Sequence, residues 1–175
     1  MESLEDLIRE IKNDDENAFR KFFLMFYDDV LRFLYFYTGD KSVAEDLTQD
    51  TFVNFWKARD RIDVSQNPKN YLFKVARNLA INYIKRQKEE GKVTAEESNL
   101  TQLPDAESFE LRDVIIEAIS ELPDRCREVF ILSRYTSLTH KEIAELLGIS
   151  LQTVKNHISK AINHLRRRLA SYLNK

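Results

Sequence analysis

Residues 139–168 read THKEIAELLGISLQTVKNHISKAINHLRRR, and this stretch decides the fold of the C-terminal part of the chain. It contains two apolar repeats at helical spacing. The first repeat is Ile143, Ala144 and Leu147, and the second is Val154, Ile158, Ala161, Ile162 and Leu165. Gly148 can adopt the positive φ that ends a helix, Ser150 can cap the next helix, and Thr139 with Glu142 forms a capping box. The stretch therefore predicts two packed helices joined by a tight turn, a helix-turn-helix.

The second helix of this motif has a polar face made of amide, hydroxyl and cationic side chains. With the capping serine, its members are Ser150, Gln152, Thr153, Lys155, Asn156, Ser159 and Lys160. Such side chains bond base edges and phosphates in a major groove. The alternative is an ordinary helical hairpin with a solvated face. We favour DNA binding, because the turn, the small Ala144, the caps and the basic face occur together at fixed spacing.

The composition indicates an all-α protein of one or two small domains. The chain has 175 residues, 43% of them hydrophobic, with only three Gly and three Pro, and long segments repeat at helical spacing. No apolar run reaches membrane-spanning length, and the acidic, amphipathic N-terminus differs from a signal peptide. Cys126 is the only cysteine, so an internal disulfide is excluded. We expect a cytoplasmic protein.

The charges are distributed unevenly along the chain. Residues 1–66 and 93–124 are acidic, the second segment having nine Asp or Glu against one Lys or Arg. Residues 67–92 carry seven basic side chains against two acidic ones, and residues 125–175 carry ten against three. Two basic blocks separated by an acidic one predict two segments that contact phosphates.

The N-terminal part predicts further helices at residues 4–11, 18–37 and 42–58. Phenylalanines dominate the second of these, and at this spacing a core is favoured over a ligand pocket. We expect the third helix to begin with a capping box of Ser42 and Glu45. Asp46, Gln49 and Asp50 lie close together on its predicted surface. Either a solvated face or a binding face fits these three residues.

Pro68 begins a predicted helix that runs to about residue 87 and combines cations with aromatic rings. Its predicted packed side is Leu72, Val75, Ala76, Leu79 and Tyr83. Its other side carries Lys74, Arg77, Asn78, Asn82, Lys85 and Arg86, with Tyr71 and Phe73 near the start. Interleaved cations and rings suit single-stranded nucleic acid, where bases stack on the rings. A helix whose aromatic side chains are all buried is the equal alternative.

Residues 89–108 lack a helical period, are acidic, and read as a linker. A helix starting at Ser108 and another after Pro123 are expected to complete a four-helix domain with the helix-turn-helix.

Three stretches together resemble the extracytoplasmic-function (ECF) sigma factors of bacterial RNA polymerase, in the sigma-70 family and of the kind common in Bacteroidetes. Residues 44–58, AEDLTQDTFVNFWKA, are similar to region 2.2 of that family. Residues 67–86, NPKNYLFKVARNLAINYIKR, are similar to regions 2.3 and 2.4, and residues 122–169 to region 4. The resemblance implies region 2 at residues 1–90, a linker at 91–108 and region 4 at 109–175.

The resemblance also implies partners. Region 2.2 of the family docks on the clamp of the largest polymerase subunit, which assigns core binding to Asp46, Gln49 and Asp50. The family captures the melted minus-ten strand with region 2, and the matching candidates are Asn67, Lys69, Asn70, Tyr71, Lys74, Arg77 and Asn78. Region 4 reads the minus-thirty-five duplex, here with the polar face of the helix-turn-helix, and meets the flap of the second-largest subunit. An anti-sigma factor, often membrane-bound in the family, is a further implied partner.

The sequence differs from many family members at Lys160 and at Gln152, so base preference cannot be transferred. A sigma factor need not be an enzyme, and the chain has no Gly-rich phosphate loop or nucleophile elbow. We expect no catalytic residue, no cofactor and no metal site. His140, His157 and His164 lack a carboxylate or thiol at ligand spacing.

Two alternatives remain at this point. A response-regulator output protein has a related helix-turn-helix, but it needs an α/β receiver, which residues 1–90 do not predict. A nucleic-acid enzyme with a helical N-terminal domain is the second.

Overall fold

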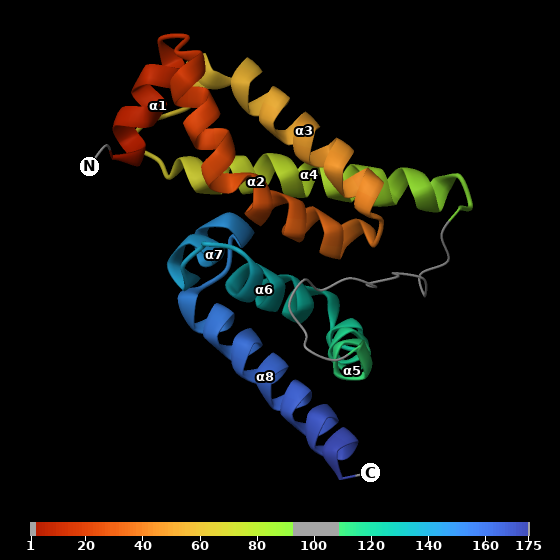
Figure 1. The fold of residues 1–175 in the computed structure, drawn as a ribbon. Coiled ribbons are helices and arrows are strands. Elements are labelled where there is room, and N and C mark those ends of the chain that lie inside the picture. Colours follow the sequence, from red (N-terminus) through yellow and green to blue (C-terminus); the bar gives the residue numbers. More distant parts are fainter. Residues whose placement is uncertain (1–2, 93–108, 175) are drawn as a thin grey trace. The chain divides into compact units, whose positions relative to one another are not determined.

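The computed structural model describes residues 3–92 and 109–174 (Figure 1). These residues form α-helices and one short 3₁₀ helix, with no strand among them, which confirms the all-α prediction. The chain divides into two compact units between residues 94 and 95. Residues 93–108 of the expected linker lie outside the described residues, and so does the expected helix start at Ser108.

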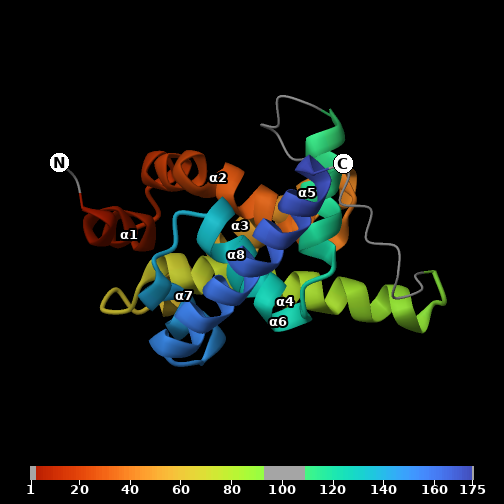
Figure 2. The same ribbon diagram turned by 90° about the horizontal axis from the view of Figure 1, so that it is seen from below.

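Unit 1 is a bundle in which three long helices share one core. Its elements are α1 (Leu4–Lys12), α2 (Glu16–Thr38), α3 (Lys41–Lys57), the 3₁₀ helix η1 (Arg59–Arg61) and α4 (Pro68–Glu89). The helices α2, α3 and α4 contact one another pairwise, and α1 packs mainly on α2. Figure 2 shows α1 and the loop before α4 at the same end of the bundle.

Local side chains set the helix ends in unit 1. The carboxylate of Asp15 accepts hydrogen bonds from the backbone N–H groups of Asn17 and Ala18 at 2.8 and 3.0 Å, and so caps α2. Gly39, with φ of 66°, ends that helix. The predicted capping box at Ser42 is wrong. Asp40 is already extended after Gly39 and accepts from the N–H of Val43 at 3.0 Å, so α3 starts earlier.

The phenylalanine stripe of α2 is part of the core, as predicted. Phe22 stacks on Phe55 of α3 with ring centroids 4.5 Å apart, and Phe33 meets Phe73 of α4 edge-on at 5.7 Å. All four side chains are fully buried. Burial of each ring contributes about 1.5–3 kcal/mol to the free energy of folding. Because the rings come from α2, α3 and α4, this burial holds the three helices together.

The buried side of α4 differs from the prediction. Phe73 and Ala80 are fully buried with Leu72 and Ala76, whereas Val75, Leu79 and Tyr83 are only half-buried. The physical reason is that α4 lies against both α2 and α3 and therefore buries a differently placed face.

The described residues of unit 2, 109–174, form four helices, also as predicted. They are α5 (Phe109–Ser120), α6 (Asp124–Tyr135), α7 (His140–Leu147) and α8 (Leu151–Leu173). Thr139 Oγ1 accepts from the N–H of Glu142 at 3.2 Å, and Glu142 Oε2 accepts from the N–H of Thr139 at 2.7 Å. Gly148 has φ of 64°, and Ser150 caps α8. The capping box, the turn and the cap of the helix-turn-helix are therefore confirmed.

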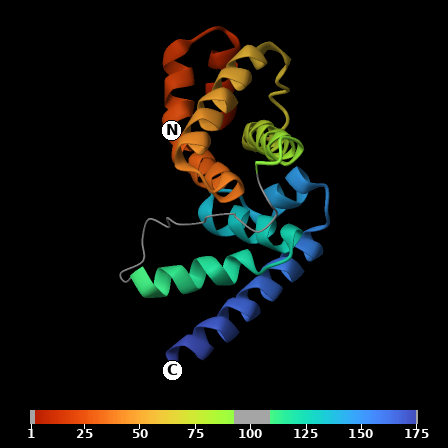
Figure 3. The same ribbon diagram turned by 90° about the vertical axis from the view of Figure 1, so that its right-hand side faces the viewer.

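The helix α8 is one long helix that packs on the other three helices of unit 2 (Figure 3). Its side chains Val154 and Ala161 are fully buried, and Leu165 packs on the core. The core of unit 2 includes Ile119, Leu122, Cys126, Phe130 and Ala161. Ile162, predicted on the packed face, is instead 37% exposed, because Ala161 and Leu165 occupy the line that faces α5 and α6.

Candidate functional site

The first candidate surface lies on α3. Asp46, Gln49 and Asp50 are all exposed and are spaced three and four residues apart, so they share one face of the helix. The opposite face holds Thr48 and Thr51, fully buried, whose hydroxyls donate to backbone carbonyls one turn earlier at 2.7 Å. The structure therefore brings the three predicted residues together on an outward-facing surface.

Sequence reasoning missed one residue of this surface. Val53 follows Asp50 by three residues and is 48% exposed, which places an apolar side chain beside the acidic group. An apolar side chain within a polar patch is a common feature of protein interfaces. A valine within an amphipathic pattern gives no sequence signal that distinguishes this position from a core position.

The second candidate surface lies on α4. Asn67 caps this helix, with its side-chain oxygen accepting from the N–H of Lys69 at 2.9 Å, and Pro68 occupies the first turn. Lys74 and Asn78 are exposed one turn apart. The other predicted residues, Lys69, Asn70, Tyr71 and Arg77, are half-buried. The exposed polar face continues along the helix through Asn82, Lys85 and Arg86.

The aromatic residues of α4 have different environments. Phe73 is fully buried against Phe33, so it cannot stack on a base. Tyr71 is half-buried, with its ring edge-on to Phe55 at 5.8 Å between centroids. The interpretation of Phe73 as a stacking residue is therefore wrong, while part of Tyr71 faces outward.

The third candidate surface is the N-terminal half of α8. Gln152, Lys155, Asn156, Ser159 and Lys160 are all exposed. The amide of Gln152 donates to Asn156 Oδ1 at 3.0 Å, which fixes both side chains on one turn. Asn and Gln side chains placed in this way have the hydrogen-bonding groups that recognise base edges in a major groove.

Two of the predicted residues in this region also maintain the helix end. Ser150 Oγ accepts from the N–H of Thr153 at 3.0 Å, and the two hydroxyl oxygens lie 2.7 Å apart. These hydroxyls are thus committed to the cap, whereas Lys155 and Lys160 extend freely from the surface.

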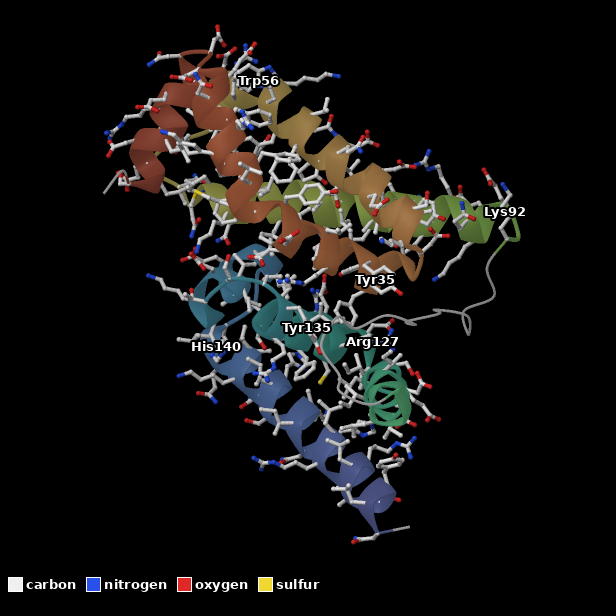
Figure 4. The ribbon with its side chains drawn as sticks, viewed as in Figure 1. Tyr35, Trp56, Lys92, Arg127, Tyr135 and His140 are labelled. Carbon is white, nitrogen blue, oxygen red and sulfur yellow. The ribbon has the colours of Figure 1, made fainter. Side chains whose placement is uncertain are left out.

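The packing of α6 holds α8 in place. The thiol of Cys126 donates to the carbonyl oxygen of His157 at 3.2 Å. Burial raises the pKa of the Cys126 thiol, partly offset by the nearby positive charge of Lys160. Arg127 donates to the carbonyl oxygens of Ile119, Ser120 and Leu122 and so satisfies the C-terminal end of α5. Figure 4 labels Arg127 where α6 meets α5.

The C-terminal half of α8 contains a cluster that the sequence did not reveal. Glu121, just after α5, contacts His164 and Arg168 at 2.9 Å each, and Glu117 of α5 lies 3.5 Å from Arg168. Arg168 turns toward α5, while Arg166 and Arg167 are exposed. Partners 43 residues or more apart in sequence give no local signal.

His140 is exposed and His157 half-buried. Among the described residues, no group of three His, Cys, Asp or Glu side chains is placed to hold a metal ion. Across the same parts of the chain, no helix is both long enough and apolar enough to cross a membrane.

Comparison with known proteins relates these surfaces to a family. A family model described as sigma-70 region 2 matches residues 22–90, and one described as sigma-70 region 4 matches residues 112–165. The ECF RNA polymerase sigma factor SigM of Bacillus subtilis is 35% identical over 147 residues, covering 81% of this chain and 89% of SigM. This chain belongs to the ECF sigma factors. SigW of the same organism is 30% identical over 176 residues, covering 93% of this sigma factor and 94% of SigW.

Solved structures agree with this assignment. The sigma factor RpoE from Bartonella quintana, solved in complex with the anti-sigma factor NepR, has a TM-score of 0.72 and 26% identity. The match covers 87% of this sigma factor and 96% of RpoE. CnrH, solved with the cytosolic domain of CnrY, has a TM-score of 0.74 over 95% of this chain and 97% of CnrH. Its 21% identity supports the shared fold alone.

The family membership decides between the alternatives. This protein is an RNA polymerase sigma factor that directs transcription initiation. A receiver domain of a response regulator requires a parallel sheet, and residues 3–92 contain helices without a strand.

Proposed function

We propose that the two units of this sigma factor recognise different parts of a bipartite promoter. Unit 1 holds the melted non-template strand of the minus-ten element, and unit 2 reads the minus-thirty-five element as duplex. The observation that carries the proposal is that each unit exposes a cationic helix face, with Lys74 on α4 and Lys155 on α8. Region 2 runs from 1 to 90, the linker from 91 to 108 and region 4 from 109 to 175.

Strand capture is the task of α4 and the loop before it. Lys74 and Asn78 lie fully outward and bind backbone and base groups, and Lys69 and Arg77 add positive charge. The exposed part of Tyr71 supplies one ring face, and stacking on a ring contributes about 1–3 kcal/mol per base. Asn67 and Asn70 complete the surface near the start of the helix. Because this surface binds only unpaired strand, it shifts the melting equilibrium toward the open promoter.

Duplex reading is the task of α8. Lys155 and Lys160 contact phosphates and so set the register, while Gln152 and Asn156 reach base edges. A good bidentate contact discriminates between bases by about 1–3 kcal/mol. Ser159 lies on the same face, and the cap formed by Ser150 and Thr153 presents the N-terminus of α8 toward the DNA backbone.

Core polymerase binds the surface of α3. Asp46, Gln49, Asp50 and the exposed Val53 form its contact with the clamp of the largest subunit, and unit 2 meets the flap of the second-largest subunit. The polymerase performs the chemistry in the cytoplasm, and the sigma factor has no catalytic activity of its own. The solved complex of RpoE with the anti-sigma factor NepR supports an anti-sigma factor as a regulatory partner here as well.

The test is transcription in vitro from genomic templates with purified core polymerase. We expect discrete start sites when this sigma factor is added and none at those positions with core polymerase alone. Start sites that are the same with and without the protein would contradict the proposal.

A further inference from the structure

The loop at residues 62–67, which connects η1 to α4, has a defined shape. The carboxylate oxygen Oδ1 of Asp63 accepts from the N–H of Ser65 at 2.9 Å and from its hydroxyl at 2.7 Å. The N–H of Gln66 donates to the carbonyl of Asp63 at 3.1 Å, and Asn67 then caps α4. Ser65 and Gln66 are exposed. The loop therefore presents its side chains from a folded turn rather than from an open chain.

The N-terminal helix α1 holds the first residue of this loop. Lys12 Nζ, at the end of α1, donates to the carbonyl oxygen of Ile62 at 2.6 Å, and the Ile62 side chain is only 3% exposed. The hydrogen bonds from Ser65 lower the pKa of Asp63, and the positive charge of Lys12 adds to this effect. One cation of α1 thus interacts with the loop backbone and with its acidic side chain.

The turn after α1 holds the segment just before the loop. Arg59 Nε donates to Asp14 Oδ1 at 2.6 Å, and Arg59 also donates to the carbonyl oxygen of Trp56 at 2.9 Å. The guanidinium lies 4.3 Å from the centre of the Trp56 ring, at the end of α3 labelled in Figure 4. Asp14 has φ of 65°, a conformation that costs free energy for a residue other than glycine.

These contacts come from outside the part of the chain that carries the family match. The region 2 match begins at residue 22, whereas α1 and the turn after it end before residue 16. The bundle core joins α2, α3 and α4, whereas Lys12 of α1 and Asp14 of the turn after it make polar contacts to residues 59 and 62. If α1 and the turn after it only covered the core, they would not need directed hydrogen bonds to residues 59–62.

We propose that α1 and the turn after it brace the loop at residues 62–67, with Lys12 and Asp14 acting as positioning residues for capture of the melted promoter strand. This inference rests on the proposed function, because it assumes that the loop and α4 bind the strand. The brace fixes the loop before the DNA arrives, so less ordering is required on binding.

The test uses the full-length chain bound to core polymerase and two variants. Lys12→Met keeps the apolar stem and removes the donor to Ile62. Asp14→Gly removes the carboxylate and also relieves the positive φ, so it keeps the fold. Arg9→Met is the matched control, because the ion pair of Arg9 within the described residues is with Asp6 on the same helix. The probe is the non-template strand of a promoter whose start site has been mapped.

We expect Lys12→Met and Asp14→Gly to weaken strand binding about three- to tenfold, the range for loss of one hydrogen bond. Arg9→Met should bind as the wild type does. Hydrogen exchange of the free chain should become faster at residues 62–67 in both variants, while the free energy of unfolding followed by circular dichroism is not reduced. This combination separates positioning from general stability.

Strand binding and loop exchange like those of the wild type in both variants would overturn the brace alone. A loss that parallels reduced unfolding stability, or that Arg9→Met shares, would also overturn it. If the wild-type holoenzyme binds the strand no better than core polymerase does, the proposed function itself fails, and the brace fails with it.

Discussion

Single residues decide which surface of each helix is available to a partner. On α3, the carboxylate of Asp50 is exposed, and Asp46 lies one turn away. Two neighbouring negative charges favour binding to a partner surface of positive charge. Asp50→Lys is expected to weaken core polymerase binding on the order of tenfold, equal to about 1.4 kcal/mol. Asp28→Lys, the same charge change at an exposed position of α2, serves as the control in a titration of labelled protein with core polymerase. Equal affinities for the two variants would remove Asp50 from the docking surface.

Two aromatic side chains of α4, Phe73 and Tyr71, differ in burial. Phe73 is fully buried, so Phe73→Ala is expected to lower the free energy of unfolding of unit 1 by about 3–5 kcal/mol. Tyr71 is half-buried, so Tyr71→Ala should destabilise less but should reduce binding to single-stranded promoter DNA. Trp56 is the only tryptophan of the chain, so its fluorescence during urea unfolding reports on unit 1. A smaller effect of Phe73→Ala than of Tyr71→Ala on stability would contradict this description of the core.

At the scale of elements, the contact between α6 and α8 gives a pH dependence. Burial raises the pKa of the thiol of Cys126 and of the phenol of Tyr135 in the folded state. The unfolded chain therefore loses these protons at lower pH than the folded chain. These groups leave the free energy of unfolding of unit 2 unchanged at pH values well below the ordinary thiol pKa of 9.0, and this free energy decreases as the pH rises from that value through the raised pKa of the folded state.

The Cys126→Ala variant tests whether the thiol of Cys126 contributes to this pH dependence. We expect its unfolding free energy to decrease less steeply between pH 8 and about 10 than that of the wild type, because the contribution of the thiol is then absent. Circular dichroism melts of both proteins across this range give the comparison. Parallel pH profiles for the two proteins would show that Cys126 does not contribute.

The elements also show what the sequence can predict. Helix ends depend on near neighbours, and the capping box at Thr139, the turn at Gly148 and the start of α4 at Pro68 were all predictable. The buried face of α4 was not, because α2 and α3 both cover it and their placement is a property of the tertiary structure. The same holds for Arg168, whose carboxylate partners are Glu117 of α5 and Glu121 just after that helix.

In the candidate surfaces too, the sequence predicts the features that depend on local spacing and not those that depend on tertiary contacts. The predicted residues of α3 and most of those on α8 are exposed together, because spacing along a helix determines which side chains share a face. The exposure of an apolar residue such as Val53 depends on three-dimensional packing. The contact between Lys12 and Ile62 joins residues 50 apart and could not be read from a local pattern.

In the whole molecule, the two units have separate DNA-binding tasks under the proposed function. If α8 reads the duplex element and α4 holds the opened strand, the effect of a substitution in each helix should depend on a different promoter element. Lys155→Ala removes a contact of unit 2, and Lys74→Ala removes one of unit 1; both side chains are exposed. A cycle that combines each protein variant with each altered promoter element measures this coupling directly.

The decisive measurement is the rate of open-complex formation by the reconstituted holoenzyme on one mapped promoter and on versions with either element scrambled. We predict that Lys155→Ala slows opening on the intact promoter and has no further effect when the minus-thirty-five element is scrambled. Lys74→Ala should still slow opening on that template and lose its effect only when the minus-ten element is scrambled. Coupling of both variants to the same element, or to neither, would contradict the division of promoter recognition between the two units.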